Sequence, residues 1–157
     1  MTYCLNQTQM TTLFVSGGNV NTLLNLEDIG NLKNLVLFDM VDQETQVKMK
    51  EKGLDFIYFK ELIKEGSESN ITNNHVQTKP EDCYTFSYTS GTTGPPKGAM
   101  LSNKNMVAFV RSFDQHNELK MHNQDVYPSY LPLPHLMERG ISLCLFYAGA
   151  AMMYNIY

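Results

Sequence analysis

Residues 88–101, YTSGTTGPPKGAML, gather small hydroxyl residues, glycines, a Pro-Pro pair and one lysine between two apolar runs. Gly91 and Gly94 allow the backbone to turn so that successive N–H groups face one concavity, an arrangement that binds anions. Lys97 adds a full positive charge. Hydroxyl donors, which can also bind Mg²⁺, come from Thr89, Ser90, Thr92 and Thr93. This combination suits the triphosphate of ATP.

Two well-known phosphate loops do not match the spacing of these glycines. A P-loop has a glycine directly before its lysine, whereas here Pro96 precedes Lys97 and Gly98 follows it. The dinucleotide fingerprint is G-x-G-x-x-G, whereas these glycines are Gly91, Gly94 and Gly98. Composition alone therefore leaves a flexible turn between a strand and a helix as an equal interpretation, and the order of the residues has to decide.

The elements on either side must position these groups. CYTFSY (83–88) is rich in aromatic and β-branched residues and is a strand candidate. Ser102 can cap a helix, and apolar residues follow it at the i, i+1, i+4, i+7 spacing of a buried face: Met106, Val107, Val110 and Phe113. We therefore expect residues 89–98 to form a loop between a strand ending near Tyr88 and a helix starting near Ser102.

The rest of the chain alternates short apolar runs with helical patterns. The expected strands are 11–16, 34–39, 55–59, a proline-broken run at 125–135, and 151–156. The expected helices are 20–30, 44–52 closed by Gly53, 60–66 and 136–147, and a polar surface loop is expected near 66–80. This alternation predicts an α/β fold with a mainly parallel sheet flanked by helices.

Composition limits the class of protein. The 157 residues are 43% hydrophobic, enough for the core of one ordinary domain. The net charge is −4 and the charges are interspersed, which argues against a nucleic-acid surface. Cys4, Cys83 and Cys144 are odd in number and widely spaced among apolar residues, so we expect buried thiols in a reducing compartment and neither disulfides nor a zinc site.

The two ends of the chain bear on targeting and completeness. MTYCLNQTQM has neither a basic start nor a long apolar core, so it is not typical of a signal peptide. ISLCLFYAGAAMMY (141–154) contains glycine and is too short for a membrane span. The chain stops at Tyr157, in or just after an apolar strand, so we expect it to be a piece of a longer protein.

Two ordered motifs connect the chain to a known family. YTSGTTGPPKGAMLSNKN (88–105) closely resembles the phosphate-binding signature of the adenylate-forming, or AMP-binding, superfamily, which includes acyl-CoA synthetases, firefly luciferase and peptide-synthetase adenylation domains. DVYPSYLPLPHLMERG (125–140) is similar to the next motif, in the form typical of long-chain acyl-CoA synthetases. NQTQMTTLFVS (6–16) resembles the strand upstream of these motifs. The resemblance implies that residues 1–157 are part of a single AMP-binding domain, the partial N-terminal domain of such an enzyme.

The resemblance also implies a chemistry. A long-chain fatty acid carboxylate attacks the α-phosphate of ATP to give an acyl-adenylate and pyrophosphate, and the thiol of coenzyme A then displaces AMP. ATP, Mg²⁺ and coenzyme A would be required. The residues that match the loop holding the β- and γ-phosphates are Thr89, Ser90, Gly91, Thr92, Thr93, Gly94 and Lys97. Thr89 is the hydroxyl expected to bind Mg²⁺.

The second motif supplies further candidates. His135 matches a position at the carboxylate end of the acyl pocket, where positioning is favoured over proton transfer; a lone histidine between Leu133 and Leu136 is otherwise a packed core residue. Glu138 and Arg139 are interpreted as a buried pair that fixes the start of a helix.

Three more residues receive weaker interpretations. Gly140 and the apolar helix after it either line the acyl channel or belong to the plain core. His116 and His122 lack ligand partners at useful spacing and are expected at the surface.

Later motifs of the family are absent: the Tyr-Gly-x-Thr-Glu stretch with its metal-binding carboxylate, the ribose-binding aspartate, and the C-terminal lid with its lysine. We therefore expect an inactive fragment or truncated product of a larger ligase. A coumarate-type ligase of the same superfamily and a non-catalytic nucleotide-binding module are the alternatives. For the parent, the resemblance implies small-molecule substrates and an intracellular location, in the cytoplasm or on the cytoplasmic face of the endoplasmic reticulum or another organelle. It leaves peripheral membrane association open.

Overall fold

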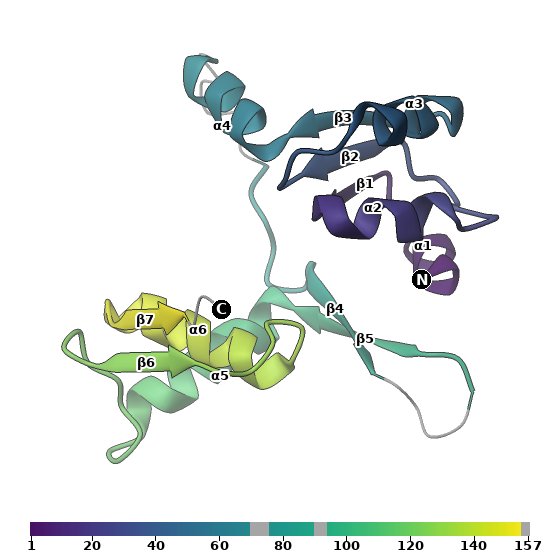
Figure 1. Cartoon of the computed structure of the whole chain (residues 1–157). Coiled ribbons are helices and arrows are strands. Elements are labelled where there is room, and N and C mark those ends of the chain that lie inside the picture. Colours follow the sequence, from purple (N-terminus) through teal and green to yellow (C-terminus); the bar gives the residue numbers. More distant parts are fainter. Residues whose placement is uncertain (70–75, 90–93, 155–157) are drawn as a thin grey trace. The chain divides into compact units, whose positions relative to one another are not determined.

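The computed structural model describes residues 1–69, 76–89 and 94–154. The chain divides into two compact units, Met1–His75 (unit 1) and Val76–Tyr157 (unit 2), and Figure 1 shows the helices and strands of each. Parallel strands alternate with helices in both units, so the predicted α/β fold is confirmed.

Unit 1 contains a three-stranded parallel sheet. Its strands are β1 (Thr12–Val15), β2 (Asn34–Leu37) and β3 (Asp55–Tyr58), in the order β1-β2-β3. The connections contain α2 (Gly17–Leu24) and α3 (Gln43–Glu51), which also contact each other. Parallel strands need such crossover helices, so the regular alternation in the sequence leads directly to this sheet.

The core of unit 1 lies between this sheet and its helices. Every member is an apolar side chain that is at most 4% exposed: Leu5, Val20, Leu23, Leu32, Leu35, Leu37, Met49 and Leu54. All three residues that end β2 are buried, as expected for the central strand of a parallel sheet.

Local signals set the ends of α3. The Asp42 side chain accepts a hydrogen bond of 2.7 Å from the Thr45 N–H, and this bond holds the pKa of Asp42 below its usual value. Gly53 has φ +75°, so its predicted role as a left-handed helix end is confirmed. Between these two features, the Lys48 ammonium pairs with Glu44 at 2.6 Å.

Lys52 links the ends of two helices. Its ammonium donates hydrogen bonds to the carbonyl oxygens of Leu24 (2.9 Å) and Leu26 (2.6 Å), at the carboxyl end of α2. A cation is favourable there because the last carbonyls of a helix are unpaired and carry partial negative charge.

Several predicted boundaries in unit 1 are wrong. The N-terminal segment forms α1 (Thr2–Thr8), which the sequence pattern did not indicate. Helix α2 begins at Gly17, before the predicted start at residue 20, and ends at Leu24. Gly30, the predicted helix end, lies in a separate turn with φ +59°. Helix α4 (Phe59–Glu68) continues into the segment predicted as a loop from residue 66, of which residues 70–75 lie outside the described part of the chain.

The described residues of unit 2 contain two pairs of strands. β4 (Cys83–Thr89) and β5 (Lys97–Ser102) are antiparallel, whereas β6 (Val126–Ser129) and β7 (Ala151–Tyr154) are parallel. The helices α5 (Asn103–Gln115) and α6 (Leu136–Ala148) contact each other. The strand expected at 125–135 is limited to four residues, since the prolines after Ser129 interrupt it.

In unit 2, a serine cap starts α5, and a glycine of α6 lies close to an aromatic ring of α5. Ser102 caps α5, as predicted, by accepting a hydrogen bond of 3.2 Å from the Asn105 N–H. Of the apolar stripe predicted for α5, Met106 is buried but Val107 is 60% exposed, so the predicted stripe is partly wrong. Gly140 of α6 faces the Phe109 ring so closely that an added Cβ would lie 2.8 Å from Phe109 Cζ.

The predicted strand end near Tyr88 and the predicted helix start near Ser102 are confirmed, but the prediction of a direct loop between that strand and that helix is wrong, because a second strand, β5, intervenes. Thr89 is the last residue of β4, and Lys97 is the first residue of β5. Helix α5 begins only after β5. The run from Gly98 to Ser102 is too short to show a period of its own, and it becomes a strand because β4 offers a pairing edge. Residues 90–93 lie outside the described residues.

The three cysteines are free thiols. Cys144 is buried, and burial raises the pKa of its thiol. Cys83 is exposed at the start of β4, so the prediction that all three are buried is wrong. Within the described ranges, none of the helices is long and apolar enough to cross a membrane.

Candidate functional site

The hairpin β4–β5 places the two ends of the glycine-containing segment side by side. Thr89 and Lys97 are register partners, and the Thr89 hydroxyl donates a hydrogen bond of 3.4 Å to the Lys97 carbonyl oxygen. Gly94 has φ +92°, a backbone conformation that glycine adopts without strain. In the described parts of the chain, no carboxylate forms an ion pair with the Lys97 ammonium. The lysine therefore presents an unneutralised charge beside an exposed hydroxyl.

Gly98 has a different role from Gly94. It pairs with Tyr88 in the ladder, and an added Cβ would lie 3.1 Å from Tyr88 Cζ. The missing side chain at Gly98 leaves room for the tyrosine ring over β5. Glycine at position 98 is therefore required for packing, whereas the spacing rules for phosphate loops concern only the binding of phosphate.

The second motif lies beside this hairpin. A pocket of about 440 Å³ is lined by Ser87, Tyr88, Thr89, Ala99, Leu101, Pro134, His135 and Leu136. Thr89 and His135, which are 46 positions apart in the sequence, thus border one cavity. His135 is exposed, so the interpretation of it as a packed core residue is wrong.

The backbone fixes where His135 stands. It occupies the N-cap position of α6, with φ −68° and ψ 131°, and its side chain does not make the cap hydrogen bond. Its N–H donates to the Pro132 carbonyl oxygen at 2.9 Å, and its own carbonyl accepts from the Arg139 N–H at 3.2 Å. The imidazole is therefore left available to the pocket.

Glu138 is fully buried and is held by hydroxyl groups. Its carboxylate accepts hydrogen bonds from the Tyr127 hydroxyl at 2.9 Å and from the Ser129 hydroxyl at 2.5 Å. Both donors belong to β6, so the first turn of α6 is attached to that strand. Burial raises the pKa of Tyr127 to about 12, and the hydrogen bond to Glu138 and its negative charge add to the increase.

Arg139 points to other partners. Its Nε donates to the Leu133 carbonyl oxygen at 2.9 Å, and a terminal guanidinium nitrogen donates to the Thr85 hydroxyl of β4. The predicted buried pair between Glu138 and Arg139 is therefore wrong. The two side chains attach the start of α6 to two different strands. Sequence reasoning missed Thr85, and no local pattern indicates it, because it lies 54 residues from Arg139.

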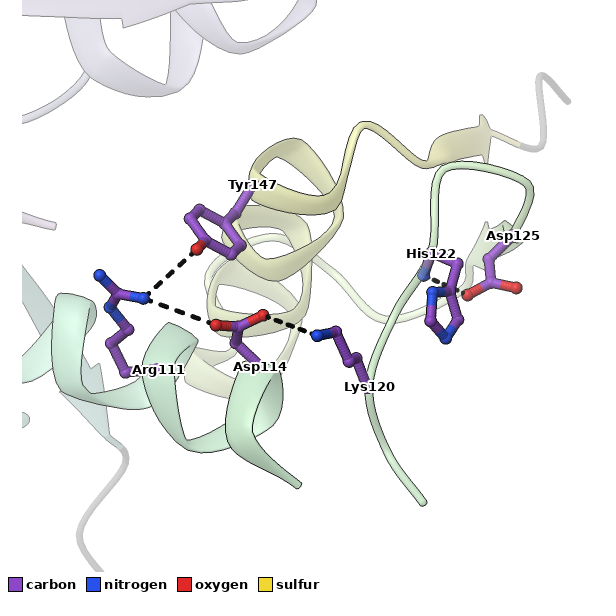
Figure 2. Close-up of polar contacts among 6 residues, drawn as sticks. All are labelled: Arg111, Asp114, Lys120, His122, Asp125 and Tyr147. Atoms are coloured by element: carbon purple, nitrogen blue, oxygen red, sulfur yellow. Dashed lines mark hydrogen bonds and ion pairs between the residues drawn. The ribbon is translucent and has the colours of Figure 1, made fainter. Parts of the chain in front are cut away.

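A separate polar cluster joins α5 to the segment after it and to α6. Figure 2 shows the Asp114 carboxylate between Arg111 (3.5 Å) and the Lys120 ammonium (3.6 Å). Arg111 also donates to the Tyr147 hydroxyl at 3.4 Å and lies 5.9 Å from the centre of that ring. Both cations contact the one carboxylate and are more than half exposed, so these are surface ion pairs that contribute little to stability.

Two other histidines of the described residues, His116 and His122, lie outside the pocket that His135 borders. His116 and His122 are exposed, which confirms the prediction. Figure 2 shows that His122 contacts Asp125 through its backbone N–H, at 2.7 Å, and not through its ring.

A magnesium site is not complete in the described residues. No group of three or more His, Cys, Asp or Glu side chains in these parts of the chain lies close enough together to hold a metal ion. Thr89 offers one hydroxyl oxygen, whereas Mg²⁺ prefers six oxygen ligands in octahedral geometry.

Comparison with known sequences gives one family. The model of the family described as "AMP-binding enzyme" matches residues 1–155. The chain is 34% identical over 152 residues to fatty acyl-CoA synthetase B of Dictyostelium discoideum, covering 97% of this chain and 21% of that protein. It is 31% identical over 151 residues to the peroxisomal long chain acyl-CoA synthetase 7 of Arabidopsis thaliana, covering 96% and 21%. The chain spans about a fifth of the length of these curated relatives.

Comparison with solved structures gives the corresponding fold. The adenylation domain of a carboxylate reductase from Mycobacterium chelonae matches with a TM-score of 0.80 at 19% identity, over 98% of this chain and 25% of that chain. A putative long-chain-fatty-acid CoA ligase from Rhodopseudomonas palustris matches with a TM-score of 0.74 at 19% identity, over 98% and 34%. At these identities the likeness concerns the fold alone.

Proposed function

Because the chain belongs to the AMP-binding enzyme family, we propose that it carries the phosphate-binding part of a long-chain fatty acid–CoA ligase. One observation supports this most directly. Thr89 and Lys97 are adjacent across the hairpin, with Gly94 in a left-handed conformation between them, where a polyphosphate would meet both a hydroxyl and a cation.

The proposed reaction has two steps. In the first, a carboxylate oxygen of the fatty acid bonds to the α-phosphorus of ATP, and the bond from that phosphorus to the bridging oxygen of the β-phosphate breaks. Pyrophosphate leaves with this electron pair. In the second, the thiolate of coenzyme A bonds to the acyl carbon and AMP leaves. The first step is required because a carboxylate is a poor acyl donor.

Lys97 acts in the first step of this proposal. Negative charge builds on the β- and γ-phosphates as pyrophosphate leaves, and a fixed ammonium stabilises that charge more in the transition state than in bound ATP. The hydroxyl of Thr89 holds a neighbouring phosphate oxygen. Ser90, Gly91, Thr92 and Thr93 would complete the loop and lie outside the described residues.

Mg²⁺ would supply charge neutralisation on the phosphates, and Thr89 remains its predicted ligand. The described residues do not fit a complete site for the ion, and no step of the proposed reaction is assigned to it.

His135 has a positioning role in the proposal. It borders the same pocket as Thr89, where the fatty acid carboxylate would approach the α-phosphate. A carboxylate is already ionised at neutral pH, so the attack requires no base. An imidazole N–H is suited to orient the carboxylate by a hydrogen bond.

The substrate class rests on the second motif. HLMER (135–139) has the form that resembles long-chain acyl-CoA synthetases, and the relatives reported above carry fatty acyl or long-chain acyl names. A ligase for aromatic acids would share the glycine-containing segment but not this motif.

The test uses the full-length parent and ATP–pyrophosphate exchange with palmitate or coumarate. We expect exchange with palmitate, and we expect Lys97→Ala to lower its rate by about 10²–10³-fold, as removal of one transition-state donor does elsewhere. Palmitate binding should change little. Lys104→Ala is the matched control, because Lys104 is an exposed lysine outside the pocket at His135.

Three results would contradict parts of this proposal. An unchanged exchange rate in Lys97→Ala removes that residue from the mechanism. Exchange with coumarate alone assigns the parent to another branch of the superfamily. ATP binding without exchange with either acid indicates a nucleotide-binding module.

A further inference from the structure

One face of β4 carries three hydroxyl residues. Thr85, Ser87 and Thr89 alternate along the strand, and their ladder partners are in regular register from Leu101 to Lys97, so the three side chains point to the same side. Ser87 and Thr89 line the pocket that His135 borders, whereas Thr85 binds the Arg139 guanidinium. This face therefore meets the start of α6 at two places.

Arg139 contacts both β4 and the segment that precedes α6. Its Nε holds the carbonyl of Leu133, two residues before His135, while a terminal nitrogen holds the hydroxyl of Thr85. The guanidinium is a planar fork with fixed donor directions, so two such bonds fix the spacing between their acceptors. Among the residues that the structure describes, no carboxylate forms an ion pair with Arg139. The positively charged guanidinium is thus bound by two neutral oxygens, the Leu133 carbonyl and the Thr85 hydroxyl.

Glu138 restrains the same helical turn from the other direction. Its bonds to Tyr127 and Ser129 attach the turn to β6. The same turn is thus bonded to β6 through Glu138 and to β4 through Arg139, and both contacts restrain the N-cap residue His135.

We propose that the contact between Thr85 and Arg139, the Thr85–Arg139 link, positions His135 against the Thr89 end of β4 for adenylate formation. This inference rests on the function proposed above. Arg139 is a positioning residue, since it acts on the site through Leu133 and Thr85 and does not border the pocket itself. Misplacing a reacting group by about 1 Å can cost about 10²-fold in rate.

Three variants of the full-length parent test the Thr85–Arg139 link. Thr85→Val keeps the shape and β-branching of the side chain but removes the hydroxyl. Thr85→Ser keeps the hydroxyl and serves as the conservative control. Arg139→Ala removes the other partner, and should it fail to fold, the nearly isosteric Thr85→Val still provides the test.

Two measurements are made on each variant. In ATP–pyrophosphate exchange with palmitate, we expect Thr85→Val to lower kcat by about 10–100-fold with little change in the KM for ATP, and Thr85→Ser to retain most of the rate. A fourth protein, the double variant Thr85→Val/Arg139→Ala, should be no slower than Arg139→Ala alone, because both changes break one contact. In hydrogen–deuterium exchange by mass spectrometry, we expect faster uptake in peptides covering residues 130–136 for Thr85→Val and unchanged uptake in unit 1.

The outcomes separate this inference from the proposed function. Wild-type kcat and wild-type uptake in Thr85→Val would overturn it, as would rate losses that add in the double variant. If the wild-type parent shows no pyrophosphate exchange with any acid, the proposed function fails. Faster uptake at 130–136 then still supports the Thr85–Arg139 link, and unchanged uptake still overturns it.

Discussion

The Glu138 carboxylate is fully buried, and two hydroxyl groups compensate for its lost hydration. A buried charge without partners costs several kcal/mol, so both donors are needed. Hydrogen bonds to an ionised acceptor are stronger than those between neutral groups. The Tyr127 proton is therefore held firmly, and its loss would place two negative charges beside each other.

This arrangement predicts a loss of stability in alkali. The pKa of Tyr127 is raised from 10.0 to about 12, by burial first and by Glu138 second. The unfolded chain releases this proton near pH 10, whereas the folded chain keeps it to about pH 12. The resulting stabilisation is complete below pH 10 and is lost as the pH rises from about 10 to about 12. Urea unfolding of the chain across pH 8–12 should show this fall in the free energy of unfolding.

Tyr127→Phe should flatten that fall, at the expense of lower stability near pH 8. The matched control is Tyr3→Phe in unit 1, where the side chain is 43% exposed. A variant curve that runs parallel to the wild type from pH 10 to 12 would show that another group causes the loss.

Some residues of the candidate site could be predicted from the sequence and others could not. Thr89, Gly94 and Lys97 lie close together in the chain, so their types and order predict an anion site without any long-range information. Thr85 was missed because its partner, Arg139, comes from a distant element, and single-sequence patterns carry no information on such contacts. Glu138 and Arg139 were recognised as structural, but the partners assigned to them were wrong.

At the scale of elements, the contact between α5 and α6 depends on one missing side chain. An added Cβ at Gly140 would approach Phe109 Cε1 even more closely than the 2.8 Å to Cζ. The Phe109 ring also packs on Phe113, with 5.0 Å between the ring centres, which limits how far it can turn away.

Gly140→Ala should therefore destabilise unit 2. Overpacking costs about 1–3 kcal/mol, whereas replacing glycine by alanine inside a helix gains roughly 0.5–1 kcal/mol. The clash outweighs the gain, and a net loss of up to about 2.5 kcal/mol in urea unfolding is expected. The double variant Gly140→Ala/Phe109→Leu should recover part of the loss.

Gly66→Ala provides the matched control in α4. An added Cβ there meets nothing within 4 Å, so only the helix propensity changes and stability should rise by roughly 0.5–1 kcal/mol. Equal effects of the two alanines would show that the contact with Phe109 is not limiting.

Elements with their own start and stop signals could be predicted from the sequence. Helix α3 has Asp42 before it and Gly53 after it, and α5 has the Ser102 cap. In contrast, β5 is a strand only because β4 pairs with it, and α1 has no side-chain cap hydrogen bond at its start. Where tertiary pairing decides the structure, local propensity is a weak guide.

At the scale of the whole molecule, we expect residues 1–157 alone to form no acyl-CoA. The described residues contain no cluster of acidic or histidine ligands for Mg²⁺, and the curated relatives are about five times longer than the part matched here. The measurement supplies the purified chain with ATP, Mg²⁺, palmitate and coenzyme A and searches for palmitoyl-CoA by mass spectrometry.

The full-length parent is the positive control for this measurement. Sustained turnover by the chain alone would show that the 157 residues contain all the catalytic groups, and it would contradict the expectation that they are an inactive part of a larger ligase. A weak affinity for ATP without product agrees with the proposal.

The strand order of unit 1 has a consequence for how the protein is made. Thr12 of β1 pairs with Asn34 of β2, which in turn pairs with Asp55 of β3, so each strand bonds to the one synthesised just before it. When a new strand leaves the ribosome, its neighbour in the sheet is already outside. Translation adds roughly 5–20 residues per second, whereas a small α/β domain folds within milliseconds to seconds. Unit 1 can therefore build its sheet one strand at a time during synthesis, before unit 2 is complete.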